Sequence, residues 1–436
     1  MKIDKIMHCD LLVIGAGLAG MTAAARAAHK GLDAIVAGNP SSFAFSSGLL
    51  DYLGVYPAES SELLKRPELG MNALTSDLPG HAYTLCGHNK VIESFEFVKT
   101  LLDRAGLPYT MHRAGSGMEN KNFITAMGTL KPSFMIPETM TAGSLAVDQE
   151  KSNKRLLVAG IKGLSGFSAA QVAQGVRKYF ADTRHVDISL PGVATGIQPQ
   201  IMAELMESVD IKSAFIEQLA VHIGDADLCG LPGICGINNS PAIVDEMSTR
   251  LGVKVFEIPG SPPSVPGMRM AFAFEQVLGR SGVRMLSNVR IKDPVFDGKK
   301  FKLTAGSHPD EITIRTNGVI LATGRFFGNG LHARRERIVE TVFYLNVAQP
   351  TGRHLWHDTK FLNPNGHAIN LAGIETDSVF RPLDPRGRPV YKSLYAVGSI
   401  LAHNDWARLK SGAGASLASA ISAVDHFVES GGSHGR

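Results

Sequence analysis

The chain opens with an apolar strand that runs directly into a glycine-rich turn and an alanine-rich helix. Residues 11–20 read LLVIGAGLAG, which is the pattern G-x-G-x-x-G placed behind a strand. Gly15 allows the tight turn, Gly17 lets the backbone approach a phosphate, and Gly20 permits close packing of the helix on the sheet. The first turn of the helix offers free N–H groups and a positive dipole end to an anion. This order predicts a nucleotide cofactor at the start of the chain.

The second strand lacks the acidic residue that dinucleotide sites carry. Such sites place Asp or Glu about twenty residues after the turn, where it binds the ribose of the adenosine half. Here the second strand, 32–37, is followed by Gly38 and Asn39, and Asp33 lies too early in the strand to reach a ribose. The pattern therefore fits a mononucleotide such as FMN. FAD stays open as the alternative, with Asn39 or backbone groups at its ribose.

Three later stretches indicate a flavin. Residues 318–325 form an apolar strand that ends in A-T-G, where small residues allow the backbone close to a cofactor. Residues 394–399 resemble the late flavoprotein strand that ends in Gly-Asp, with Ser399 in place of the Asp. Residues 411–417 open a final helix of small residues, whose N–H groups can face the electron-accepting edge of a flavin. The order of these elements is more specific than any one of them.

Hydroxyl-bearing and small residues complete the predicted cofactor site. Ser46, Ser47 and Gly48 follow the second strand, where related flavoproteins pass beside the isoalloxazine ring; an ordinary hydroxyl-rich turn is the competing interpretation. The predicted cofactor contacts are Ile14, Gly15, Ala16, Gly17, Leu18, Ala19, Gly20, Gly38, Asn39, Ser46, Ser47, Gly48, Thr323, Gly324, Arg325, Gly398, Ser399, Gly414, Ala415 and Ser416.

The candidates for catalysis are His81, His403 and Arg325. Imidazole titrates near neutrality and can take or give a proton at a hydroxyl-bearing carbon, although a lone His is more often structural. Arg325 follows A-T-G directly, and a guanidinium matches a phosphate or a reduced flavin anion. A solvated surface arginine is the alternative interpretation.

The four cysteines, Cys9, Cys86, Cys229 and Cys235, contain no C-x-x-C pair. We therefore expect no iron–sulfur cluster and no other metal held by this chain alone. Cys229 and Cys235 lie close in the sequence, so a redox or metal pair stays open. A free cysteine in a reducing compartment is more often a small buried apolar residue.

Length and charge bound the remaining possibilities. The chain has 436 residues and a net charge of +4, so it is long enough for two domains and too weakly charged to suggest nucleic acid or a membrane surface as a partner. No apolar run approaches the roughly eighteen residues of a spanning helix, and the N-terminus lacks a signal peptide, so we expect a cytoplasmic chain. We predict a Rossmann-like α/β flavin-binding domain at 1–106 and 266–436, with an inserted α+β cap domain for substrate or partner at 107–265.

Segments over most of the chain resemble the B subunit of the anaerobic glycerol-3-phosphate dehydrogenases. Besides the glycine turn they are 45–51 (FSSGLLD), 81–83 (HAY), 132–143 (PSFMIPETMTAG), 161–167 (IKGLSGF), 256–259 (FEIP) and 262–267 (PPSVPG). The resemblance implies an FMN-carrying partner of an FAD-bearing dehydrogenase subunit. A third, iron–sulfur subunit then anchors the complex and passes electrons to membrane quinone.

The same resemblance implies a flavin-dependent oxidoreductase subunit that takes part in oxidising sn-glycerol 3-phosphate to dihydroxyacetone phosphate. It implies a cytoplasmic chain held at the membrane through its partner subunits. Two other classes stay open. One is a stand-alone FAD-dependent enzyme of the fumarate-reductase-like kind, although no dense cluster of His and Arg marks a dicarboxylate site. The other is a non-catalytic electron-relay or assembly subunit that binds a flavin.

Overall fold

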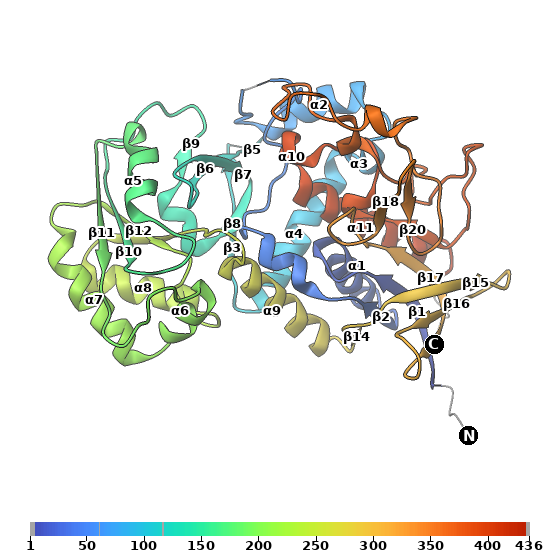
Figure 1. Cartoon of the computed structure of the whole chain (residues 1–436), viewed down its shortest axis with the longest axis horizontal. Helices are drawn as coiled ribbons and strands as arrows, with labels where there is room; N and C mark the ends of the chain where they lie inside the picture. Colours follow the sequence, from blue (N-terminus) through green and yellow to red (C-terminus); the bar gives the residue numbers. More distant parts are fainter. Residues whose placement is uncertain (1–4, 61, 116, 433–436) are drawn as a thin grey trace.

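The glycine-rich turn follows an interior strand of a seven-stranded sheet (Figure 1). The computed structural model describes residues 5–60, 62–115 and 117–432. The strands run in the order β14 (Arg284–Leu286), β2 (Ala34–Ala37), β1 (Lys5–Ile14), β17 (Ile312–Leu321), β16 (Phe301–Ala305) and β15 (Ile291–Phe296), and β20 (Leu394–Ala396) also pairs with β17. β14, β2, β1, β17 and β20 are parallel, whereas β16 and β15 extend the sheet as antiparallel strands. The carboxyl ends of the parallel strands therefore meet at one edge.

Helices cover this sheet, and an ion pair joins two of them. The run 11–14 of β1 is buried, as expected for a parallel strand covered on both faces. Four longer helices pack around it and against one another: α1 (Leu18–His29), α4 (His88–Arg104), α9 (Val265–Arg280) and α11 (Gly412–Glu429). Arg26 of α1 binds Asp425 of α11 through two hydrogen bonds of 2.8 Å each. This buried pair fixes α1 against α11, so the two helix N-termini keep a constant relative position.

Shorter elements surround the carboxyl edge of the sheet. A 3₁₀ turn at Pro40–Phe45 follows β2, and a β-hairpin of β18 (Leu331–Ala333) and β19 (Ile338–Glu340) follows β17. The remaining helices of this part are α2 (Pro67–Asp77), α3 (Ala82–Cys86) and α10 (Trp406–Leu409). Three further 3₁₀ turns lie at Arg353–Leu355, Ala368–Leu371 and Gly398–Ile400.

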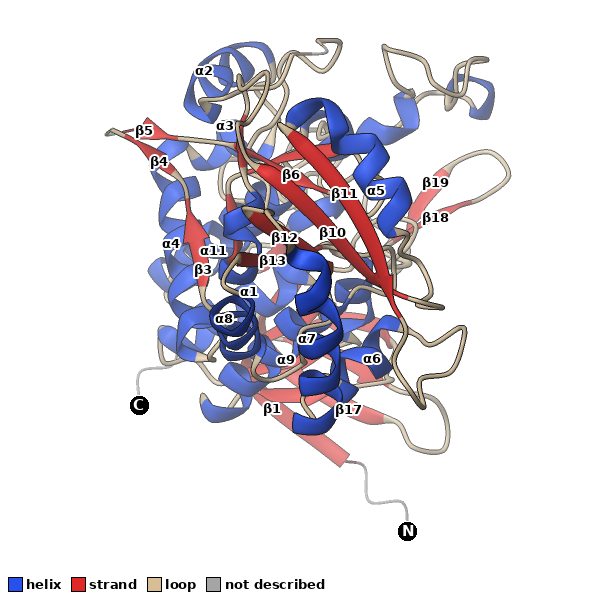
Figure 2. Cartoon of the chain, turned by 90° about the vertical axis from the view of Figure 1, so that its left-hand side faces the viewer, coloured by secondary structure: helices blue, strands red, loops and turns tan. Residues whose placement is uncertain are grey.

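A second sheet forms the other half of the molecule, at the left of Figure 1 and facing the viewer in Figure 2. Its four parallel strands run in the order β11 (Asp182–Ile188), β10 (Arg155–Ile161), β12 (Leu228–Pro232) and β13 (Lys254–Ile258). Alternate side chains of β10 enter two different cores: Leu156 and Val158 pack with α5, whereas Leu157 and Ala159 pack with α6, α7 and α8. These helices are α5 (Ala169–Val176), followed by a 3₁₀ turn at Arg177–Tyr179, α6 (Pro199–Leu205), α7 (Val209–Ile223) and α8 (Ser240–Leu251).

Short antiparallel strands lie between the two halves. They are β3 (Tyr109–Met111) with β8 (Met135–Pro137), β4 (Arg113–Ala114) with β5 (Gly117–Met118), and β6 (Lys121–Ile124) with β7 (Leu130–Ser133) and β9 (Leu145–Ala146). A 3₁₀ turn at Glu138–Gly143 follows β8. A buried ion pair joins the halves here, because Arg269 of α9 binds Glu257 of β13 at 2.6 and 2.9 Å.

The Rossmann-like α/β arrangement predicted from the sequence is confirmed. The inserted part mixes helices with both parallel and antiparallel strands, and its four-stranded parallel sheet is not specified by the predicted α+β cap. The domain limits at 107 and 265 stay a prediction.

Candidate functional site

The three glycines of the turn have three different environments. Gly15 has a φ of +112°, and a β-carbon there would lie 2.3 Å from the carbonyl oxygen of Ala322. A β-carbon at Gly20 would lie 1.8 Å from the carbonyl oxygen of Gly15, so the helix packs directly on the turn. At Gly17 the nearest atom to such a β-carbon is the Ser42 hydroxyl oxygen, at 3.1 Å. The first and third glycines are thus required by packing, and the second borders the space above the turn.

The end of β2 leaves no room for an acidic side chain at position 38. Gly38 has a φ of +146°, and a β-carbon there would stand 3.0 Å from the backbone nitrogen of Ala16. Asn39 forms a reciprocal pair with Asn288: its amide nitrogen donates to the Asn288 side-chain oxygen at 2.8 Å, and its side-chain oxygen accepts from the Asn288 backbone N–H at 2.8 Å. The amide that the sequence analysis left available to an FAD ribose is therefore already bonded.

The serine run after β2 makes local hydrogen bonds. The Ser46 and Ser47 hydroxyls accept from the backbone N–H groups of Gly48 and Leu49, at 3.2 and 3.4 Å. The Gly48 carbonyl accepts from the Tyr109 hydroxyl at 2.9 Å. These bonds match the hydroxyl-rich turn named as the alternative, and flavin contact by Ser46, Ser47 and Gly48 stays a prediction.

Ser42 is a site residue that the sequence analysis did not single out. It lies in the 3₁₀ turn Pro40–Phe45, and its hydroxyl faces Gly17 at the start of α1. The available signal was the hydroxyl-rich composition of the segment that follows β2, which also contains Ser46 and Ser47. Because Ser42 lies beside the glycine turn, its hydroxyl is a candidate hydrogen-bond donor to an anion bound at that turn.

The ends of β17 and β20 meet the starts of two helices at Gly398. Gly324 has a φ of +68°, and a β-carbon there would lie 3.4 Å from the Ser399 hydroxyl oxygen. Gly398 has a φ of +77°, and its β-carbon would stand 2.6 Å from Ala19 Cβ and 3.7 Å from Ser416 Oγ. Ala19 lies in the first turn of α1, and Ser416 lies near the start of α11. The strand ends and both helix N-termini thus converge on one point.

Both helix starts are open toward this point. In the described part of the chain, neither α1 nor α11 has a side-chain hydrogen bond at its N-cap or an acidic residue in its first turn. The first N–H groups of α1 therefore remain available to an anion, as do those of Gly412 and Ala413 in α11. At α11, the Gly414 backbone N–H donates to the carbonyl of Asp51 at 2.9 Å, and a β-carbon at Gly414 would strike the Tyr83 hydroxyl.

His81 and His403 lie near each other, beside the loop that leads into α10. His81 is fully buried and caps α3, because its Nδ1 accepts from the Tyr83 backbone N–H at 3.1 Å. Burial lowers the pKa of His81 to about 4, and Asn404 offsets part of that lowering. His403 is half-exposed, and its Nε2 lies 2.9 Å from Glu375. His81 is therefore a neutral ring at pH 7, whereas the His403 ring can be reached by a ligand.

Arg325 points into the protein. Its terminal nitrogens donate to the carbonyl of Asn370, to the carbonyl of Leu401 at 2.8 Å and to the carbonyl of Asn404 at 3.0 Å. Burial lowers the pKa of Arg325 to about 10, although Asp405 acts in the opposite direction. Only Nε lacks a hydrogen-bond partner within the described residues. This geometry favours a structural role over either interpretation that the sequence analysis offered, and flavin or phosphate contact by Arg325 stays a prediction.

Most of the predicted cofactor residues come together at the carboxyl edge of the main sheet. The predicted residues that lie at the two helix starts and just at or after the ends of β1, β2, β17 and β20 are Ile14, Gly15, Ala16, Gly17, Leu18, Ala19, Gly20, Gly38, Gly324, Gly398, Ser399 and Ser416. Gly414 and Ala415 lie inside the first turn of α11. The hydroxyl of Thr323 is buried and has no hydrogen-bond partner among the described residues. Asn39 lies two residues after the end of β2, at the start of the 3₁₀ turn. This arrangement fits a cofactor phosphate, since it combines close backbone approach with uncapped N–H groups.

The cysteines are free thiols, and three of the four are buried. Cys229 and Cys235 are among the buried ones, and burial raises the pKa of Cys229 to about 12. Within residues 5–60, 62–115 and 117–432, no group of three or more His, Cys, Asp or Glu side chains is placed to hold a metal. Over the same ranges, no helix has the length and apolar character needed to cross a membrane.

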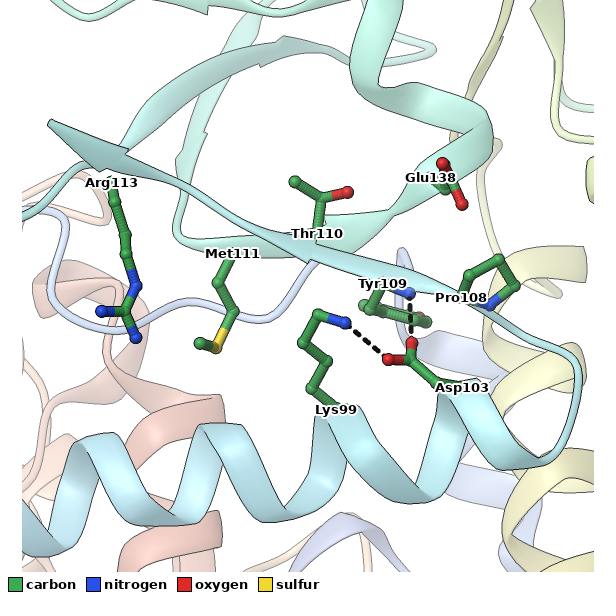
Figure 3. A pocket seen from close by; sticks show the side chains of 8 residues that line it. All are labelled: Lys99, Asp103, Pro108, Tyr109, Thr110, Met111, Arg113 and Glu138. Carbon is green, nitrogen blue, oxygen red and sulfur yellow. Dashed lines mark hydrogen bonds and ion pairs between the residues drawn. The ribbon is translucent and has the colours of Figure 1, made fainter.

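A separate hollow of about 380 Å³ lies between α4 and β3 (Figure 3). Three of its charged side chains are paired: Lys99 with Asp103 on α4, and Arg113 with Glu96 at 2.9 Å. Asp103 also accepts from the Tyr109 backbone N–H at 3.0 Å. The lining contains none of the predicted site residues, so the glycine edge remains the candidate site.

Comparison with known proteins identifies the family of the chain. The FAD binding domain family matches residues 10–417, from the first strand to the start of α11. The chain belongs to this family. Membership in the FAD binding domain family makes a flavin the cofactor of this chain, as the glycine turn and the A-T-G strand predict.

Two curated relatives are named as the same subunit of one enzyme. The B subunit of the anaerobic glycerol-3-phosphate dehydrogenase of Vibrio vulnificus (strain YJ016) is 26% identical, over 97% of this chain and 97% of its own length. The probable B subunit of the same enzyme in Halobacterium salinarum (strain ATCC 29341 / DSM 671 / R1) is 29% identical, over 96% of this chain and 97% of its own. The resemblance seen in the sequence segments is thus confirmed over nearly the full length. Among solved structures, 3-ketosteroid delta1-dehydrogenase from Sterolibacterium denitrificans is 12% identical with a TM-score of 0.43, over 97% of this chain and 100% of that one.

Proposed function

We propose that this chain is the FMN-carrying subunit of a dehydrogenase that oxidises sn-glycerol 3-phosphate to dihydroxyacetone phosphate. Its electrons leave through an FAD-bearing dehydrogenase subunit and an iron–sulfur, membrane-anchoring subunit to membrane quinone. The chain itself is cytoplasmic and held at the membrane by these partners. The names and coverage of the relatives support the substrate and the multi-subunit setting.

The observation that carries the proposal is the convergence at Gly398 of two helix N-termini without side-chain caps and the ends of β17 and β20. In this proposal the α1 N-terminus, with Gly17 and Ser42, holds the flavin phosphate. The α11 N-terminus stabilises negative charge on a reduced isoalloxazine ring. When bound there, the flavin supplies the two-electron acceptor that alcohol oxidation requires.

Two features favour FMN over FAD. The φ of +146° at Gly38 and the 3.0 Å approach of Ala16 N disfavour any side chain there, the acid that binds an adenosine ribose included. The amide of Asn39, the next candidate, is used by Asn288. The mononucleotide has no adenosine half and needs neither group.

His403 is the proposed proton acceptor for the substrate hydroxyl. Its ring is half-exposed, and Glu375 at 2.9 Å fixes the orientation of the ring. His81 is suited to a different role, because its Nδ1 accepts a backbone hydrogen bond and its Nε2 therefore carries the hydrogen. It can donate a hydrogen bond and hold its neighbours, but accepting a proton would require it to release the α3 cap.

The test is to denature the purified chain and identify the released flavin by chromatography. We expect FMN in about a one-to-one ratio with protein, since the chain has one glycine turn of this kind. Stoichiometric FAD would overturn the mononucleotide part of the proposal and leave the flavoprotein assignment in place. Recovery of no flavin from the chain, whether purified alone or in its complex, would overturn both.

A further inference from the structure

Two exposed phenylalanines contact each other beside the candidate site. Phe45 is 58% exposed and Phe327 is 67% exposed, yet their ring centroids lie 4.6 Å apart in an edge-to-face arrangement. Exposed apolar side chains are ordinary singly, but a pair that bridges two distant chain segments needs a reason. Neither side chain belongs to the buried core.

The topology shows what this contact crosses. Phe45 ends the 3₁₀ turn that follows β2, and Phe327 lies in the loop that follows β17. β1 lies between β2 and β17 in the sheet. The contact therefore links the segments that leave the carboxyl ends of the two strands on either side of β1, at the same edge of the sheet as the glycine turn. Ser42, in the same turn as Phe45, already faces Gly17.

We propose that Phe45 and Phe327 form an aromatic strap across the glycine turn that restricts this site to a mononucleotide flavin. The inference rests on the proposed function in that it takes the bound group to be a flavin. It goes further by naming the residues that select the length of the nucleotide.

A second contact, at the end of β2, supports the selection of FMN over FAD. The Asn39–Asn288 pair joins the end of β2 to the segment after β14 by two hydrogen bonds of 2.8 Å. In a dinucleotide site of this fold the adenosine extends from the phosphate turn toward the end of β2. Here the asparagine pair closes that direction at its outer end, and in this proposal the strap covers the part nearer the glycine turn. A single phosphate at the α1 N-terminus fits beneath the strap, whereas an adenosine requires both closures to open.

The chemistry of the strap is suited to this purpose. Phenyl rings offer no hydrogen bond to a ribose or a second phosphate, so an adenosine that displaced them would lose its hydration without gaining polar partners. Their edges can still cover the apolar surface of a flavin that lies toward α11. The strap therefore penalises the longer cofactor more than it penalises FMN.

The experiment compares flavin binding to the apoprotein of the full chain. Flavin is removed from the wild type, from the F45A/F327A double variant and from the F361A control. Each apoprotein is then titrated with FMN and with FAD, and binding is followed by the quenching of flavin fluorescence. Phe361 is a matched control because it is 89% exposed and, among the described residues, its ring does not stack on the ring of Phe45 or Phe327. Thermal melting of each apoprotein confirms that the loss of exposed phenyl groups leaves the fold intact.

We expect the wild type and F361A to bind FMN at least about tenfold more tightly than FAD, and the double variant to reduce that ratio by about tenfold. The reduction should come from tighter FAD binding and faster FMN release. A double variant with the wild-type ratio would overturn the strap and leave the proposed function standing. Tighter binding of FAD than FMN by the wild type would instead overturn the mononucleotide proposal together with the strap.

A second variant probes the other closure. N39A/N288A removes the pair at the end of β2 and leaves both phenylalanines in place. We expect it to lower the FMN-to-FAD preference as well, with a further decrease when it is combined with F45A/F327A. An unchanged preference in the combined variant would show that neither closure selects the cofactor.

Discussion

The carbonyl oxygen of Gly15 stands 1.8 Å from the point that a β-carbon of Gly20 would occupy. The helix α1 thus approaches the strand end so closely that its third residue can carry no side chain. This contact places the α1 N-terminus over the turn, and the backbone of the turn over the phosphate position.

Gly20→Ala should destabilise the protein by about 3 kcal/mol, because the new methyl group must displace the turn itself. Urea unfolding measures the loss as a lower midpoint at an unchanged slope. The control is Gly279→Ala in α9, where a β-carbon meets nothing within 4 Å. Removal of a helix glycine there should raise stability by about 0.5–1 kcal/mol. Equal effects of the two variants would contradict the packing argument.

Gly17→Val should abolish flavin retention while the fold survives. The only close atom at this position is the Ser42 hydroxyl oxygen, 3.1 Å from the β-carbon, and that side chain can rotate. The branched side chain then fills the space that the phosphate needs. Visible absorbance of the purified variant, together with its melting temperature, checks both parts. A folded Gly17→Val variant with full yellow colour would show that the flavin binds elsewhere.

The sequence predicts the elements at the site better than the contacts between them. Its apolar runs bounded by glycine locate β1, β17, β20 and α11, because backbone approach leaves a local composition that can be read. The Asn39–Asn288 and Phe45–Phe327 pairs join residues that are distant in sequence, and no local pattern marks them. The positive φ at Gly38 also depends on the position of Ala16, which only the folded chain defines.

In the inserted part, the sequence does not predict which strands pair. Short buried strands such as β12 and β13 read as apolar runs without a period, which cannot be told from buried helix by pattern alone. Their parallel pairing depends on the helices α5 to α8 that cover both faces. The environment of His81 is likewise not predictable from the sequence. Nothing near this residue in the sequence reveals that it caps α3 or that it is fully buried.

His81 should make folding less stable in mild acid. The unfolded chain binds its proton near pH 6.5, whereas burial lowers the pKa of His81 in the folded chain to about 4. Its contribution is therefore complete above pH 6.5 and falls by about 1.4 kcal/mol per pH unit as the pH drops toward 4, or ~3 kcal/mol in all. His81→Ser keeps an acceptor for the Tyr83 N–H and does not titrate.

Urea unfolding at pH 7 and at pH 4.5 measures this dependence. The difference in stability between the two conditions should be smaller in His81→Ser than in the wild type, by about 2 kcal/mol. An identical pH dependence in both proteins would show that the folded His81 binds its proton as easily as the unfolded one.

Arg325→Lys should weaken the fold more than it weakens flavin binding. The guanidinium holds the carbonyls of Asn370, Leu401 and Asn404 together, and one ammonium group cannot reach all of them in the same directions. We expect a loss of about 2 kcal/mol or more in unfolding free energy. Arg335→Lys, at an exposed position, is the control. A large loss of flavin affinity at unchanged stability would instead support the cofactor contact predicted from the sequence.

The last prediction concerns the partners. The relatives that match nearly the whole chain are named as one subunit of a dehydrogenase, and the proposal routes the electrons of this chain's flavin to quinone through the other subunits. The isolated chain should therefore reduce a quinone analogue slowly with glycerol 3-phosphate as donor. Addition of the FAD-bearing and iron–sulfur subunits should raise the rate well above that of the chain alone. The same reconstitution with Gly17→Val should stay slow, because the partners are present and the flavin is not. Rapid quinone reduction by the isolated chain, unchanged when the other subunits are added, would favour a stand-alone enzyme.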